Sequence, residues 1–215
     1  MPNHESHDVV GPDRITWEGF MDRKQLEELL YQSLETERGG VRIYEKAVQC
    51  AKNDDLKKEW GEYLEQTRNH EVIMLRVLDA FGLNPENETP GRGIIRTKSQ
   101  TLVDAMDAAK ADPVAAQLVA AECVVEAESK DHMNWELIGE VAAKLTGEEK
   151  RTLEEAHSEV EEEEDEHLYH TMGWARELWL ESLGLPAVLP PHEEKKHTKS
   201  AIGAERAKQA RKEML

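Results

Sequence analysis

Apolar residues recur at helical spacing over four long segments of this sequence, and no stretch alternates with a period of two. The first segment, residues 23–51, places its apolar side chains three, four or seven positions apart on one stripe. Comparable stripes predict helices over residues 55–81, 114–144 and 148–183. We therefore expect an all-α protein built around a four-helix bundle.

The connections between these segments differ in length, and this difference predicts how the helices are joined. Asn53-Asp54 and Thr146-Gly147 are short reversals, so each predicts an antiparallel helical hairpin. The connection over residues 82–113 is much longer and contains LNPENETPGRG, a pair of isoleucines and, we expect, one short extra helix near residues 101–110. A connection of this length can cross the bundle once between the two hairpins.

The charge pattern divides the chain and limits its partners. We expect an N-terminal extension over residues 1–22, the four-helix bundle over 23–185, and a linker with a basic C-terminal helix or tail over 186–215. The chain has 45 acids and 27 bases, a net charge of -18, whereas its last part has seven bases and four acids. The acidic body has no basic face for nucleic acid but suits cations. The basic tail either meets an acidic partner or is solvated.

Several other classes of protein find no support in the sequence. No apolar run approaches the ~18 residues of a membrane-spanning helix, and the first residues do not resemble a secretion signal. Cys50 and Cys123 fall within expected helices and have no CxxC partner, so we expect reduced thiols and a cytoplasmic location, without a membrane partner. The glycines at Pro90–Gly93 lack the GK[ST] ending of a phosphate loop, and no spacing suggests a nucleophile–histidine pair.

Two polar residues lie in the middle of the apolar stripes of the first hairpin. Glu37 shares its line with Leu30 and Tyr44, each seven residues away, and His70 is equally central on the next helix. A buried carboxylate costs several kcal/mol unless it is paired or binds a metal. A buried histidine that is merely hydrogen-bonded in the core is the alternative for His70.

The second hairpin carries two further groups of polar residues. Glu164 and His167 form an ExxH whose two ends lie on the apolar stripe of their helix. Glu128 and His132 follow three-four spacing on the preceding helix, next to Asp131. A glutamate–histidine pair on a hydrated surface is the alternative for Glu128 and His132.

The six residues are expected at one level of the bundle. Glu37 and His70 lie 16 and 17 residues from Asn53, and the groups of the second hairpin lie at similar distances from its reversal. At a rise of 1.5 Å per residue, these offsets agree within about two helical turns. Carboxylates and imidazoles without thiolates suit iron or manganese, with zinc as a substitute. Two ions would also offset the repulsion between buried acids.

With these motifs, residues 24–184 resemble the ferritin-like superfamily of di-iron or di-manganese carboxylate proteins. The family pattern is a glutamate from each of two helices and an ExxH from each of the other two. Glu37 and Glu164-x-x-His167 match it, Glu128 can serve as the second glutamate, and His132 would be an additional ligand. The second helix departs from the pattern, since it has Thr67-x-x-His70. The stretches AAECVVEAESKDHMNWELIGE and EEEEDEHLYHTMGWARELWLESLGLPAVLPP resemble a bacterial ferritin-like family of undefined activity.

The resemblance implies a ferritin-like bundle and redox chemistry with oxygen, peroxide or Fe(II), as in a ferroxidase, a peroxidase or a catalase-like enzyme. Metal ions and a small oxidant would be its partners. A non-catalytic storage protein and a metal-free interaction scaffold are the alternatives, and the chain could form a homo-oligomer. Further candidates for the metal site or its surroundings are Glu71, Asp131, Glu163, Thr67, Tyr44, Tyr63 and His170.

Overall fold

In the computed structural model, residues 21–189 and 201–215 are described, and they form six helices and no strand. The helices are α1 (Arg23–Cys50), α2 (Asp54–Ala80), α3 (Pro90–Ala109), α4 (Pro113–Ala142), α5 (Gly147–Ser182) and α6 (Ala201–Met214). The all-α prediction is confirmed, and the four long helices begin and end within two residues of the expected positions. The N-terminal extension predicted over residues 1–22 lies almost entirely outside the described residues.

Side chains at the helix starts explain where the helices begin. The side-chain oxygens of Asp22, Asn53 and Asp112 each accept hydrogen bonds from two N–H groups in the first turns of α1, α2 and α4. Gly147, at the reversal between α4 and α5, has a φ of 73°, a conformation that glycine adopts at little cost. These local signals fix the two hairpins.

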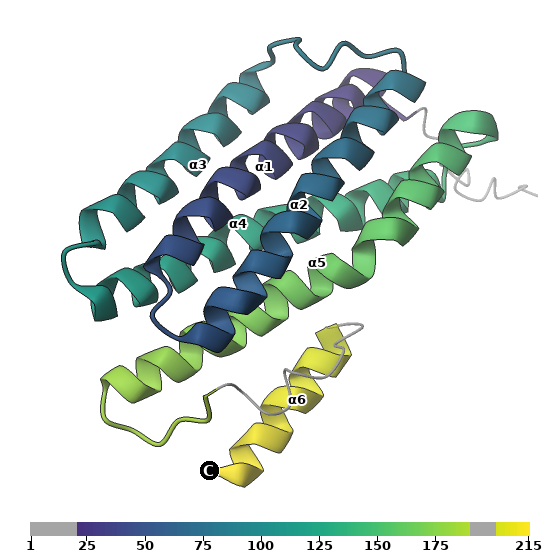
Figure 1. Cartoon of the computed structure of the whole chain (residues 1–215). Helices are drawn as coiled ribbons and strands as arrows, with labels where there is room; N and C mark the ends of the chain where they lie inside the picture. Colours follow the sequence, from purple (N-terminus) through teal and green to yellow (C-terminus); the bar gives the residue numbers. More distant parts are fainter. Residues whose placement is uncertain (1–20, 190–200) are drawn as a thin grey trace, which may run out of the picture.

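The four long helices lie side by side, and α3 lies along α1 and α4 (Figure 1). Helix α1 packs against α2, α3 and α4, while α5 packs against α4 and α2. The short helix α6 rests against α5. Helices α1, α2, α4 and α5 therefore enclose a common interior.

The extra helix in the long connection differs from the expectation. It was expected as a short helix over residues 101–110, but α3 begins at Pro90 and has 20 residues. Thr89 is its N-cap, because its hydroxyl accepts a hydrogen bond from the N–H of Arg92 at 3.2 Å, and Pro90 follows in the first turn. The buried Arg92 also pairs with Glu35 of α1 at 3.0 Å, which fastens the start of α3 to the bundle.

A polar layer interrupts the apolar core near the middle of the bundle. On α1, one apolar cluster ends at Leu34 and a second begins at Ile43, with Glu37 between them. On α5, Val160 belongs to the first cluster and Trp174 to the second. The two clusters hold the four long helices together on both sides of this layer.

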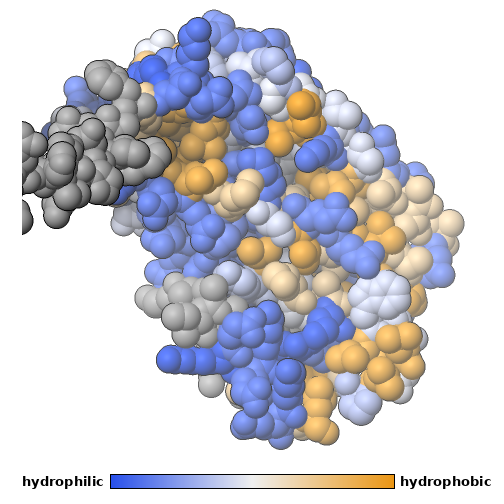
Figure 2. Space-filling model, turned by 180° about the vertical axis from the view of Figure 1, so that it is seen from behind, coloured by the Kyte–Doolittle hydropathy of each residue, from blue (hydrophilic) through white to orange (hydrophobic). Residues whose placement is uncertain are grey.

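Apolar and hydrophilic side chains are both found on the surface. The face shown from behind in Figure 2 has apolar patches separated by hydrophilic side chains. Trp179, Leu183 and Leu185 are exposed near the end of α5. Within the described ranges, no helix is long and apolar enough to cross a membrane.

Candidate metal centre

The polar layer consists of six ionisable side chains that come from four helices. Each is at most 3% exposed to solvent. They are Glu37 of α1, His70 of α2, Glu128 and Asp131 of α4, and Glu164 and His167 of α5. Of the six residues that the sequence favoured as ligands, the structure therefore brings five together, and Asp131 joins them.

Two groups of three residues within this layer could each hold a metal ion. His70, Glu164 and His167 form one group, and in each group one ligand atom from every residue lies within 4.8 Å of the others. The Nδ1 atom of His70 is 2.9 Å from Glu164 Oε1, and that of His167 is 3.6 Å from the same oxygen. Both imidazoles therefore turn the same ring nitrogen toward one carboxylate.

The second group contains only carboxylates, namely Glu37, Asp131 and Glu164. It adjoins the first group, since Glu37 Oε2 is 3.8 Å from His70 Nδ1. Glu164 belongs to both groups. Glu128 borders the first group, with Oε2 3.6 Å from His167 Nδ1.

The atoms that face the centre lack hydrogen-bond partners. These atoms are Glu37 Oε2, Glu128 Oε2, Asp131 Oδ1, both carboxylate oxygens of Glu164, and the Nδ1 atoms of His70 and His167. A buried polar group without a partner costs about 1–3 kcal/mol, and a charged group costs more. A metal cation would satisfy these atoms together, so the donor set fits such an ion.

The outward-facing atoms of the same residues are, in contrast, hydrogen-bonded. His70 Nε2 is 2.8 Å from Glu163 Oε2, and His167 Nε2 is 2.9 Å from Gln66 Oε1. These oxygens accept from the Nε2–H groups, which leaves both Nδ1 atoms directed at the centre. Outer partners of this kind orient histidine ligands in metal sites.

The indole of Trp135 orients a buried carboxylate in the same way. Its Nε1–H donates to Glu37 Oε1 at 2.8 Å and leaves the other oxygen of Glu37 facing the centre. Sequence reasoning did not single out Gln66 or Trp135 as partners of the ligands. No local pattern identifies them, because each contact joins residues about a hundred positions apart in the sequence.

The buried acids perturb one another. Burial, and then the charge of Glu164, raises the pKa of Glu37 well above its ordinary value, although the hydrogen bond from Trp135 opposes this shift. Burial and the charges of Glu37 and Glu164 likewise raise the pKa of Asp131. Such shifts mean that the carboxylates are not stable side by side as bare anions.

The imidazole of His70 shows the complementary effect. Burial lowers its pKa, but the hydrogen bond to Glu163 and the close carboxylate of Glu164 outweigh burial and raise the pKa to about 10. Without a metal, a proton on this ring therefore supplies part of the positive charge that the layer needs. A metal ion would displace this proton when it binds.

His132 lies beside the centre rather than in it. Its Nδ1 is 3.4 Å from Asp165 and its Nε2 is 3.5 Å from Glu136, and its side chain is 16% exposed. The buried positions of α4 follow Val124, Glu128, Asp131 and Trp135, a regular spacing of four, three and four residues. This face includes Asp131 and turns His132 toward α5.

The other candidates surround the centre at different depths. Glu163 contacts His70, whereas Glu71 pairs with Arg38 at 3.0 Å on the bundle surface. Thr67 is buried and donates its hydroxyl proton to the carbonyl of Tyr63 at 2.9 Å, so it satisfies itself within α2.

The aromatic candidates line the layer on the side of the second apolar cluster. The rings of Tyr44 and Tyr63 lie against His167, with centroids 5.8 and 4.3 Å from that of the imidazole. The hydroxyl of Tyr63 is 2.9 Å from His170 Nδ1. His170 therefore contacts Tyr63, the ring that lies against His167.

Comparisons with protein families, curated proteins and solved structures find no match for this chain. Over its described residues the chain is all-helical, and it has buried His, Glu and Asp groups that could bind a metal ion.

Proposed function

We propose that this chain is a ferritin-like redox protein with two carboxylate- and histidine-bound iron or manganese ions, acting on oxygen, peroxide or Fe(II). The observation that supports it is the convergence, from four helices, of seven buried ligand atoms that have no hydrogen-bond partner. Such atoms are costly in an apolar core unless a cation neutralises them.

The two groups of ligands suggest how the ions would be shared. His70 and His167 would bind one ion, Glu37 and Asp131 the other, and Glu164 both. Glu128 would complete the first site beside His167. Bound iron or manganese would supply one-electron redox chemistry. The chain would hold the ligands in place and keep bulk water out through the apolar clusters on both sides.

The type of ligand favours iron or manganese. All ligand atoms are carboxylate oxygens or imidazole nitrogens, and a mixture of this kind suits these metals in their +2 and +3 states. Neither cysteine belongs to a ligand group, and Cys123 donates instead to the carbonyl of Leu102 at 3.6 Å.

The ligand arrangement also suggests how the chain departs from the ferritin-like pattern. In that pattern α2 would carry a glutamate where this chain has Thr67. Asp131 of α4 supplies a buried carboxylate to the same layer. We infer that the missing ligand of α2 is replaced from α4, so that the number of carboxylates is kept.

We infer that cations enter the centre at the contact between α2 and α5. The side chain of Glu163 is 36% exposed, yet its Oε2 touches the buried His70. One carboxylate therefore connects the surface of an acidic protein with the centre. Acidic side chains at such an opening would raise the local concentration of cations.

The direct test is metal content followed by turnover. The full-length chain, purified without an affinity tag and supplied anaerobically with Fe(II) or Mn(II), should retain about two ions per chain. The Glu164→Gln variant should lose most of this metal. The Glu155→Gln variant, which alters an exposed residue of the same helix, should retain it.

The outcomes separate the alternatives. Oxidation of Fe(II) or consumption of peroxide by the wild type, and its loss in Glu164→Gln, would support a redox enzyme. Stable metal without turnover would instead indicate a storage protein or carrier. A wild-type chain that retains no metal would contradict the proposal and leave a helical scaffold.

A further inference from the structure

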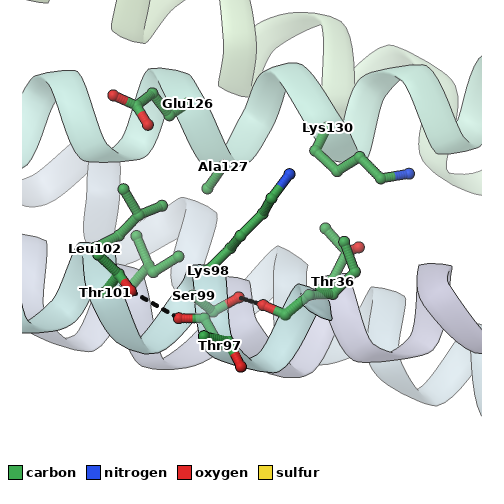
Figure 3. A pocket seen from close by; sticks show the side chains of 11 residues that line it. Thr36, Thr97, Lys98, Ser99, Thr101, Leu102, Glu126, Ala127 and Lys130 are labelled. Atoms are coloured by element: carbon green, nitrogen blue, oxygen red, sulfur yellow. Dashed lines mark hydrogen bonds between the residues drawn. The ribbon is translucent and has the colours of Figure 1, made fainter. Parts of the chain in front are cut away.

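A cavity lies outside the metal centre, between α3 and α4. Its volume is about 350 Å³, which is within the range of small-molecule sites. The side chains of α3 face those of α4 across it, and Thr36 of α1 lies at one end (Figure 3). No part of the proposed metal chemistry uses this cavity.

One wall of the cavity is apolar. Ile43, Ile95, Leu102 and Ala127 contribute hydrocarbon surface from three helices. A short alkyl chain placed against this wall would be removed from water, which is favourable in proportion to the apolar area buried.

The hydroxyl groups that line the cavity have no proton to offer a ligand. Each donates to a main-chain carbonyl four residues earlier in its own helix, at 2.8–3.0 Å. These residues are Thr36, Thr97, Ser99 and Thr101. The remaining donors in the lining are therefore the ammonium groups of two lysines.

Lys98 and Lys130 bring two positive charges to the same cavity. Lys98 extends from α3 toward α4, into the space beside Lys130 (Figure 3). Lys130 donates to Asn134, and burial together with the charge of Lys98 lowers its pKa. Glu126 also lines the cavity, but among the described residues neither lysine forms a salt bridge with it or with another acid.

We propose that this cavity binds a small amphiphilic anion, with the acidic group between Lys98 and Lys130 and a short hydrocarbon tail against the apolar wall. The anion would relieve the repulsion between the two ammonium groups and accept their free protons. A lysine is a point charge without the planar fork of arginine, so it sets the sign of the ligand's charge rather than its geometry.

The cavity and the metal centre are distinct. None of the six residues of the polar layer lines the cavity, and the fully buried Asn134 donates to Thr36 Oγ1 at 3.1 Å. Glu37, the next residue of α1, directs its free oxygen to the opposite side, toward His70. Binding of the anion can therefore be measured without any metal.

Calorimetric titration of the full-length chain, in the presence of a chelator, tests the proposal. Octanoate should bind with one site per chain. Octanol has the same tail without the charge, and sulfate has charge without a tail, so each should bind at least tenfold more weakly. Equal binding of octanol, equal binding of sulfate, or no binding of octanoate would overturn the proposal.

Variants locate the site. Lys98→Ala should weaken octanoate binding about tenfold, because Lys98 is exposed and its loss leaves the fold intact. Ala127→Phe should abolish binding by filling the cavity. Lys144→Ala removes an exposed lysine from the region just after α4 and should have no effect.

The same variants distinguish other places of binding. If octanoate binds equally to Lys98→Ala and to the wild type, the anion is not held at this cavity and the proposal is wrong. If Glu164→Gln abolishes binding while Lys98→Ala does not, the anion occupies the metal centre, which also contradicts it. Should Ala127→Phe not fold, the comparison of Lys98→Ala with Lys144→Ala still decides.

Discussion

Replacement of Asp131 by asparagine should separate the stability of this protein from its affinity for metal. Asp131 is buried, its Oδ1 has no hydrogen-bond partner, and its ligand atom lies within 4.8 Å of those of Glu37 and Glu164. Asparagine has nearly the same shape but carries no charge, and its amide can donate to those carboxylates. The metal-free protein should therefore become more stable.

The size of the effect follows from the burial of this carboxyl group. Burial raises the pKa of Asp131, so the metal-free fold must either bury its charge or bind a proton, and removing this cost should increase the free energy of unfolding by about 2 kcal/mol. For a chain of this size, 1 kcal/mol corresponds to about 2–4 °C, so the melting temperature should rise by ~4–8 °C. Metal affinity should fall by about a hundredfold, which makes the stabilisation by metal ~3 kcal/mol smaller.

The assay is thermal unfolding of both proteins, once with a chelator and once with excess Mn(II). Glu140→Gln, an exposed change on α4 that removes the same charge, is the control and should alter neither measurement. A lower melting temperature of Asp131→Asn in chelator would show that Asp131 is a structural residue. An unchanged increase with Mn(II) would show that it is not a ligand.

Two further predictions concern pH and packing. The raised pKa values of Glu37 and His70 mean that the metal-free fold binds more protons than the unfolded chain, so its stability should fall as pH rises from about 5 to 9, whereas metal affinity should increase. Urea unfolding with and without Mn(II) at several pH values would measure both effects. A stability in chelator that does not change with pH would contradict the reasoning. Gly39→Ala would place its Cβ 2.8 Å from Ser99 Cβ and should destabilise the fold by about 1–3 kcal/mol. Gly61→Ala, whose Cβ meets open space within α2, should stabilise the fold by ~0.5–1 kcal/mol. Urea unfolding would measure both changes, and equal effects would contradict the close packing of α1 on α3.

The long helices could be predicted because their signals are local. Apolar spacing sets their faces, and the side chains of Asn53 and Asp112 cap the starts of α2 and α4. The same type of signal, Thr89 followed by Pro90, marks the start of α3, but the polar sequence LNPENETPGRG gives few apolar positions around it. The buried Arg92 that pairs with Glu35 further obscures the apolar face of this helix.

The candidate site was predictable to the level of a helical face. Periodicity placed Glu37, His70, Glu164 and His167 inward, and all four are buried in the polar layer. It could not decide between Asp131 and His132, which are adjacent. That choice depends on the rotation of α4, which is set by its packing against α1 and α5 rather than by its own sequence.

The free-energy cost of burying the polar layer is offset by the apolar packing in the rest of the bundle. Apolar clusters on both sides contain the largest buried side chains, among them Trp60, Trp135 and Trp174. Two of these indoles also donate hydrogen bonds to glutamates, Trp135 to Glu37 and Trp174 to Glu59. The side chains that stabilise the fold thus also orient acids. A chain that needed only stability would fill this layer with leucine, since well-packed apolar residues often replace buried ionic groups without loss. The retention of seven buried ligand atoms without hydrogen-bond partners is therefore more readily explained by the binding of cations than by folding.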